Sequence, residues 1–312
     1  MIKPEYFFWM AVLLSFSLGG SGGGAMPTSE SVVAAVAEAQ APNPFLALAL
    51  EAKAVTVYDA RLHRMLFEKD ADIALPLASV TKVMTAATAL SLVPATTLVT
   101  VSADAIKQEG DSGFFVNEEW RLRDLLRFML LESSNDAAYA VAERVGAVAA
   151  SSEDAVAGRA FFLGAMNKRA ASLGLSQTHF ENETGLDNDE TTDSPARANA
   201  ESTARETALF FADALARFPD IFTATKWEDL SLSAANGVLR DARNTNHEVS
   251  KLPLLLASKT GFTDLAGGNL VVAFDADFGH PIVVVVLGST ETARFSDVEQ
   301  LVWATLRFLS IK

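Results

Sequence analysis

The chain has 312 residues, 50% of them hydrophobic and 21% charged, which suits a globular protein with one large domain or two small ones. Its formal net charge of −14 argues against a nucleic acid partner, because an acidic surface repels phosphates. There is no cysteine, and the four histidines are scattered, so the sequence excludes a thiol nucleophile and disulfides and indicates no metal or other cofactor.

The first residues form a pattern typical of a targeting segment. Lys3 precedes the apolar run Tyr6 to Leu18, which is shorter than the roughly 20 residues that span a bilayer. Small residues at Gly23 and Ala25 suit cleavage. We therefore expect residues 1–25 to be a signal peptide and the protein to be exported, to the periplasm or the extracellular face of the cytoplasmic membrane. If it is not cleaved, the segment would be an N-terminal anchor, and only then do we expect contact with a membrane.

Residues 26–46 are predicted to be a flexible linker. Small and polar residues open this stretch, and an Ala-rich part that follows is expected to form at most a short helix ending before Pro42 and Pro44. One compact domain is then expected over residues 47–312, because no second linker and no internal repeat follows.

Apolar periodicity assigns the elements of this domain in chain order. Strands are expected over 53–60, 63–70, 226–233, 252–260, 268–276 and 280–289, and helices over 79–92, 121–132, 135–150, 158–174, 202–218 and 297–312. The late strands are joined by turns too short for parallel crossovers. The order predicts an α/β (α+β) fold: an antiparallel sheet flanked by helices from its N- and C-terminal sides, with a helical subdomain inserted between early and late strands.

Three short motifs stand out, although each has a plain structural explanation. The first runs from Ser79 to Lys82, where the serine caps a helix and the lysine reaches water past an apolar face. The second, Ser133-Ser134-Asn135, suits the N-cap of the next helix. The third, Lys259-Thr260-Gly261, suits a strand that ends in a turn. Taken singly, none of them indicates a function.

Together with their flanks, the motifs resemble the D-alanyl-D-alanine carboxypeptidase family of penicillin-binding serine peptidases. The similar blocks follow the family's order: "LASVTKVMTA", "LRDLLRFMLLESSNDAAYAVAE", "NETGL", "STARETA", "NTN" and "LLASKTGFTDLAGGNLV". The resemblance covers roughly residues 52–288. It implies a β-lactamase/DD-peptidase-like fold for the domain at residues 47–312.

The chemistry explains the residue types of the first motif. A serine hydroxyl needs a base to become a nucleophile, and Lys82 can reach Ser79 from one turn away. Lys82 acts as a base only when neutral, so we expect burial and a second cation, Lys259, to lower its pKa.

The resemblance adds roles for the other motif residues. It implies that Ser133 relays a proton to the leaving amine and that Asn135 positions Lys82 and the substrate. Lys259 and Thr260 would bind the substrate carboxylate. The backbone N–H groups of Ser79 and Phe262 would form the oxyanion hole, and Gly261 would allow the strand to approach the ligand.

The resemblance therefore implies a serine-type D-Ala-D-Ala carboxypeptidase or D-amino-acid endopeptidase that acts on peptidoglycan stem peptides through an acyl-serine and is inhibited by β-lactams. A serine β-lactamase is one alternative, although the nearest match to its Glu-x-x-Leu-Asn motif, Glu183 to Asp187, ends in Asp. A non-catalytic module that binds cell-wall peptides is another. The acidic stretch 188–201 is longer than the family usually has, and we expect a loop there that alters substrate choice if it borders the cleft.

Overall fold

The computed structural model describes residues 43–188, 191 and 194–310. One compact unit begins at Asn43, a few residues before the predicted start of the domain. The boundary moves because Phe45, in the short helix η1 (Pro44–Ala47), is buried and stacks on Phe67 with a ring-centroid distance of 4.9 Å. The predicted signal peptide or anchor and most of the predicted linker lie outside the described residues, so those predictions remain open.

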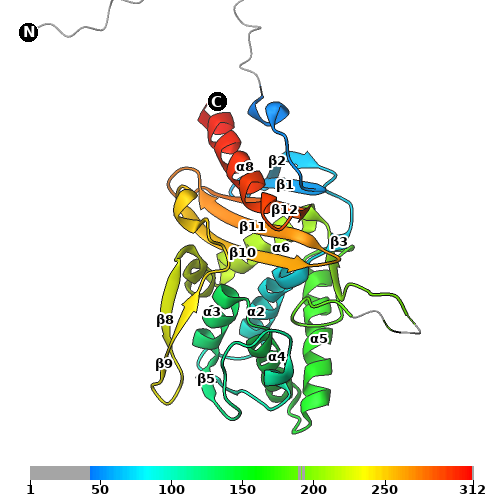
Figure 1. Ribbon diagram of the computed structural model, residues 1–312, viewed down its shortest axis with the longest axis vertical. Coiled ribbons are helices and arrows are strands. Elements are labelled where there is room, and N and C mark those ends of the chain that lie inside the picture. The colour runs from blue at the N-terminus through cyan, green and yellow to red at the C-terminus, as the bar shows by residue number, and fades with distance from the viewer. Residues whose placement is uncertain (1–42, 189–190, 192–193, 311–312) are drawn as a thin grey trace, which may run out of the picture. The chain divides into compact units, whose positions relative to one another are not determined.

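A five-stranded antiparallel sheet forms one end of this unit, in the order β10-β11-β12-β1-β2 (Figure 1). The strands are β1 (Ala54–Asp59), β2 (Arg64–Lys69), β10 (Leu255–Thr263), β11 (Gly267–Asp275) and β12 (Pro281–Ser289). The central strand β12 is a run of β-branched residues buried on both faces, which favours an extended conformation in the middle of a sheet. The antiparallel sheet expected from the sequence is therefore present, and the five strands match predicted ones.

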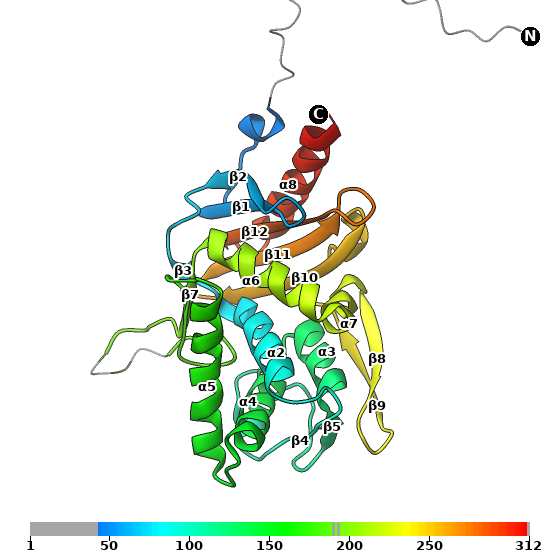
Figure 2. The ribbon, with the colours of Figure 1, turned by 180° about the vertical axis from the view of Figure 1, so that it is seen from behind.

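Successive side chains of β12 point to opposite faces of the sheet and belong to two different hydrophobic cores. Val284 and Val286 face α8 (Ala293–Ser310), where they join Leu301 in one core. Val283 and Val285 point the other way, into the larger core that includes α6 (Ala204–Arg217). Figure 2 shows α6 crossing the sheet on the face opposite α8. The C-terminal helix α8 covers one face of the sheet, as the sequence predicts. The other face is covered by α6, from the end of the helical block, and not by the first helix of that block.

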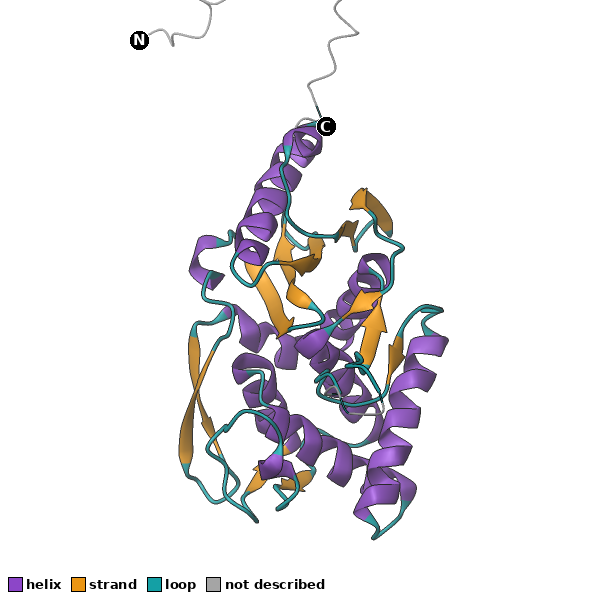
Figure 3. Cartoon of the chain, turned by 45° about the vertical axis from the view of Figure 1, so that its right-hand side comes forward, coloured by secondary structure: helices purple, strands orange, loops and turns teal. Residues whose placement is uncertain are grey.

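The helical subdomain lies beyond the sheet, between β2 and β10 in sequence (Figure 3). Its main helices are α2 (Thr81–Leu92), α3 (Leu122–Glu132), α4 (Asn135–Ala150) and α5 (Ala155–Ser172). Helices α4 and α5 touch through two glycines: a Cβ added at Gly146 would lie 1.9 Å from the carbonyl oxygen of Gly158. The missing side chains therefore allow the two helix backbones to meet directly.

The remaining elements of the described part of the chain are short strands and single helical turns. They are β3 (Leu75–Pro76), β4 (Leu98–Thr100), β5 (Glu119–Arg121), β6 (His179–Phe180), β7 (Ala200–Ser202), β8 (Asp229–Ser233), β9 (Leu239–Arg243), α7 (Pro219–Phe222) and the 3₁₀ turns η2 (Ala78–Val80), η3 (Ala105–Lys107), η4 (Thr223–Lys226) and η5 (Val249–Lys251). Within the stretch 188–201, Asn188 and Arg197 form an isolated antiparallel bridge. The influence of this stretch on substrate choice stays a prediction.

Candidate active site

Ser79 lies in the single turn η2, which leads directly into α2. Two glycines allow other backbones to press on this turn from outside. A Cβ added at Gly185 would lie 1.9 Å from the carbonyl oxygen of Ala78, and one at Gly261 would lie 2.8 Å from that of Leu77. These distances are too short for a residue with a Cβ atom at either position. The turn that carries Ser79 is thus held between the loop at Gly185 and the strand β10.

Lys82 points its amine at Ser79 from the first turn of α2. Its Nζ lies 2.8 Å from Ser79 Oγ, 2.7 Å from Asn135 Oδ1 and 2.8 Å from the Thr184 carbonyl oxygen. A protonated lysine has three N–H donors for these three acceptors. A neutral amine keeps two N–H donors for the two carbonyl-type oxygens, so its lone pair is left facing the serine hydroxyl. This arrangement suits a general base.

The pKa of Lys82 is lowered to about 7, and burial is the main cause, because the side chain has no exposed surface. The charge of Glu183 opposes this and raises the pKa. The sequence predicted that Lys259 would help to lower the pKa of Lys82. Repulsion between the two amines is mutual, and the pKa of Lys259 also falls well below its usual value, through burial first and then through the charges of Lys82 and Arg294.

Ser133 and Asn135 reach the two lysines from the junction of α3 and α4. Ser133 ends α3 in a left-handed conformation with φ of 60°, and Ser134 caps α4 by accepting a hydrogen bond from the backbone N–H of Ala137 at 3.1 Å. This sharp turn directs the side chain of Ser133 towards Lys259 and that of Asn135 towards Lys82. Asn135 Nδ2 donates to the Glu109 carbonyl at 2.7 Å, which leaves its Oδ1 for Lys82.

The strand β10 supplies the remaining predicted residues. Lys259 Nζ donates to Ser133 Oγ at 2.9 Å and to the Thr260 carbonyl at 2.8 Å. The Thr260 hydroxyl lies 2.5 Å from that of Thr245, in the "NTN" block. Gly261 brings the strand against η2, and the Phe262 side chain is 44% exposed. The structure thus brings all three motifs together: Lys82 is hydrogen-bonded to Ser79 and Asn135, and Lys259 is hydrogen-bonded to Ser133.

Two contributions to the site were not predicted. Arg294, at the start of α8, is buried and donates from Nη1 to the Gly261 carbonyl at 2.7 Å, so a second cation lies near Lys259. The Thr184 carbonyl is the other, because it is the third acceptor of Lys82. For the Thr184 carbonyl, the block "NETGL" is the only signal in the sequence, and it does not indicate a role for a backbone atom.

The profile of the D-alanyl-D-alanine carboxypeptidase family matches residues 36–291. The chain belongs to this family. It is 30% identical to the D-alanyl-D-alanine carboxypeptidase DacC of Escherichia coli over 83% of its own length. It is 28% identical to the D-alanyl-D-alanine endopeptidase of Pseudomonas aeruginosa, over 88% of this chain and 84% of that protein. The match spans 62% of DacC, and it also spans 62% of DacA from the same organism.

Solved structures show the same fold. A Streptomyces DD-transpeptidase superposes with a TM-score of 0.71 and 26% identity, covering 83% of this chain and 98% of the other. A penicillin-binding protein of Listeria monocytogenes in its ampicillin-bound form superposes with a TM-score of 0.65 and 28% identity, over 82% and 98% of the two chains. The fold class expected from the sequence, with its likeness to DD-peptidases, is confirmed.

The described residues contain no group of three His, Cys, Asp or Glu side chains arranged to hold a metal ion. Two of the four histidines have other roles in the packing. His280, directly before β12, has its Nε2 2.9 Å from Oδ1 of Asp59 in β1. The His247 ring packs against Phe295. Among the described residues, Lys82 is the titratable side chain that is hydrogen-bonded to Ser79 Oγ, while Lys259 is hydrogen-bonded to Ser133.

Proposed function

We propose that this protein is a serine-type D-Ala-D-Ala peptidase that hydrolyses the stem peptides of peptidoglycan, as a carboxypeptidase or a D-amino-acid endopeptidase. The observation that carries the proposal is the buried amine of Lys82, which lies 2.8 Å from Ser79 Oγ and has a pKa of about 7. An amine with this proton affinity is partly neutral at physiological pH, so it can take the serine proton.

In the proposed reaction, neutral Lys82 removes the Ser79 hydroxyl proton as Oγ attacks the carbonyl carbon between the two D-alanines. The backbone N–H groups of Ser79 and Phe262 stabilise the oxyanion. The tetrahedral intermediate collapses when the C–N bond breaks, as Ser133 gives its hydroxyl proton to the leaving amine and receives in return the proton that Lys82 took from Ser79. Lys82 is then neutral again. Water then hydrolyses the acyl-Ser79 ester, and penicillins form an ester with the same oxygen.

The substrate carboxylate would bind at Lys259, with the Thr260 hydroxyl and the charge of Arg294 nearby. Burial is the main cause of the lowered pKa of Lys259, and the charges of Lys82 and Arg294 lower it further. A carboxylate bound at Lys259 would favour its ammonium form and offset the cost of burying that charge. The site thus favours a ligand with a free carboxylate.

The proposed location is outside the cytoplasmic membrane, as an exported protein of the periplasm or the extracellular face. The support is the leader pattern of residues 1–25, which lie outside the described part of the chain. Among the helices that the structure does describe, none has the length and apolarity to cross a bilayer. Membrane attachment would require the leader to stay uncleaved.

The β-lactamase alternative requires a glutamate that activates the deacylating water. Glu183 is the nearest match in sequence, yet its side chain is fully buried and both its carboxylate oxygens lie 3.1 Å from Arg159 Nε. A carboxylate engaged in this way is poorly placed to activate water, and this favours the peptidase.

A labelled penicillin tests all three functions. The peptidase is expected to form a long-lived adduct on the peptide that contains Ser79, and Ser79→Ala is expected to form none. Rapid turnover would favour the β-lactamase, and the absence of any adduct would favour the binding module. A label on Ser133 would overturn the assigned nucleophile. Mass spectrometry of digested peptidoglycan then separates released D-alanine from split cross-links.

A further inference from the structure

The loop that accepts a hydrogen bond from Lys82 is itself rigidly built. Asn182 Oδ1 accepts hydrogen bonds from the backbone N–H groups of Thr184 at 3.2 Å and Gly185 at 2.7 Å, which closes a turn over Glu183. The loop then contacts α2 twice: the Thr184 carbonyl accepts from Lys82, and the Glu183 carbonyl accepts from Thr85 Oγ1 at 2.7 Å. The backbone of this loop therefore fixes the position of one of the three hydrogen-bond partners of the Lys82 amine.

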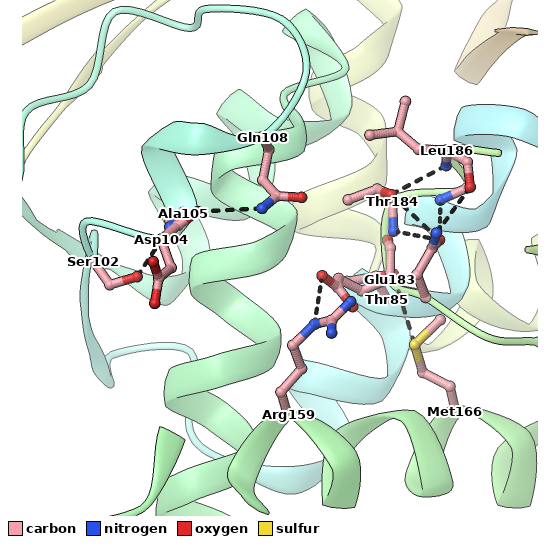
Figure 4. Close-up of polar contacts among 12 residues, drawn as sticks. Thr85, Ser102, Asp104, Ala105, Gln108, Arg159, Met166, Glu183, Thr184 and Leu186 are labelled. Atoms are coloured by element: carbon pink, nitrogen blue, oxygen red, sulfur yellow. Dashed lines mark hydrogen bonds and ion pairs between the residues drawn. The ribbon is translucent and has the colours of Figure 1, made fainter. Parts of the chain in front are cut away.

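The Glu183 side chain anchors the loop from its other side (Figure 4). Its carboxylate is fully buried and pairs with Arg159, whose side chain comes from α5 and is 32% exposed. The Arg159 guanidinium also lies 4.9 Å from the centre of the Tyr139 ring. An ion pair this enclosed is expensive to form, and nothing in the proposed reaction uses it.

We propose that Arg159 and Glu183 are a positioning pair for the acylation step, which holds the Thr184 carbonyl against Lys82 so that the lysine lone pair faces Ser79. The inference rests on the proposed function and adds two residues to it. Neither touches the reacting atoms, so both act through Lys82.

The two charges of the pair should affect the lysine in opposite senses. The charge of Glu183 favours the ammonium form of Lys82, against the larger effect of burial. Arg159 partly cancels that charge because it lies directly on the carboxylate. Removing the negative partner should therefore make Lys82 easier to deprotonate, and removing the positive partner should make it harder.

The test is the pH profile of penicillin acylation at saturating penicillin, measured on the full chain. Glu183→Gln keeps the shape and a hydrogen-bond acceptor but removes the charge, and it should move the midpoint of the rising limb down by about one pH unit. Arg159→Met should move that midpoint up and also lower the plateau rate by roughly tenfold or more, because the loop loses its anchor.

A matched control lies two residues away. Glu181 pairs with Arg197 at 2.6 Å, but both side chains are well exposed, so Glu181→Gln removes the same charge where water screens it. This control should leave the midpoint unchanged.

A purely structural pair would lower the thermal stability of both variants and leave both midpoints at the native pH, and that result would overturn the proposal. Arg159 is partly exposed, so Arg159→Met should fold even if Glu183→Gln does not. The direction in which Arg159→Met moves the midpoint then tests the proposal alone. Failure of the native protein to form any adduct would instead reject the proposed function itself, before the pair is tested.

Discussion

Lys82 has two carbonyl-type acceptors and one hydroxyl around a single buried nitrogen. The two carbonyl-type oxygens can only accept, so they always require N–H donors, and only Ser79 can exchange its role from acceptor to donor. Loss of one proton from the amine therefore reverses the Lys82–Ser79 hydrogen bond alone. This geometry turns a change in protonation into activation of the nucleophile.

Lys82→Arg should abolish nearly all acylation although it keeps the positive charge, because arginine does not release its proton. In the native protein, acylation at saturating penicillin should increase with pH through a midpoint near the Lys82 pKa of about 7. Stopped-flow acylation rates and circular dichroism check both points. A well-folded Lys82→Arg protein that acylates at a near-native rate would remove Lys82 from the mechanism.

The second prediction concerns Lys259 and the charge of the substrate. Amidation of the substrate's C-terminus should reduce the native rate constant by about 10- to 150-fold, which corresponds to ~1.5–3 kcal/mol for a charge-assisted hydrogen bond. The same amidation should cost Lys259→Ala much less, since that contact is already absent. Steady-state kinetics with the paired substrates measures both losses, and equal losses would show that Lys259 does not bind the carboxylate.

The predicted site residues share a property that a sequence reveals: each belongs to a short motif with an unusual residue type beside an apolar run. Arg294 has no such signal, because it lies in α8 while its neighbour Gly261 lies in β10, and only the packing of the helix on the sheet joins them. The Thr184 carbonyl is harder still to predict, since every residue has a carbonyl and only the loop geometry selects this one.

Among the helices, α4 and α5 provide a test of close packing. Gly146→Ala should destabilise the domain by roughly 1–3 kcal/mol or more, because the new methyl group meets the backbone of Gly158 at 1.9 Å. Gly164→Ala is the matched control in α5, where nothing lies within 4 Å of the added Cβ. That change should stabilise the helix by about 0.5–1 kcal/mol. Urea unfolding compares the two, and equal effects would contradict the packing argument.

Long elements were predictable from the sequence and short ones were not. Helices α3 and α4 and the strand β12 follow apolar patterns that persist over many residues, so their bounds agree with the predicted ranges within a few positions. The strands β3 and β6 contain two residues each, too few for any periodicity. They exist because β7 lies between them and pairs with both, and such pairing depends on tertiary structure.

The buried lysine also affects the stability of the whole domain. In the unfolded chain a lysine holds its proton up to about pH 10.4, whereas in the fold the pKa of Lys82 is about 7. Between these values the unfolded state binds more protons, so this residue makes the native domain less stable as pH falls, and the full cost applies below the folded pKa.

Lys82→Met lacks this proton-linked cost. The melting temperature of the variant relative to that of the native protein should be most favourable near pH 6 and should decrease steadily as pH rises towards 9. Lost hydrogen bonds to Asn135 and Thr184 lower the variant's stability at every pH and do not change this slope. Calorimetry across this pH range measures the difference, and a pH-independent difference would contradict the lowered pKa.

The order of strands in the sheet also determines when the domain can fold. Strand β1 pairs with β12, so Val57 meets Val284, and the backbone N–H groups of Glu51 and Ala52 donate to the Asp297 carboxylate in α8. β1 can pair early with β2, which follows it in the chain, but a ribosome must make nearly the entire chain before β1 meets β12. Contacts this distant in sequence form slowly. For a chain that we expect to be exported, such a delay leaves time for an unfolded polypeptide to enter a translocation channel before its sheet closes.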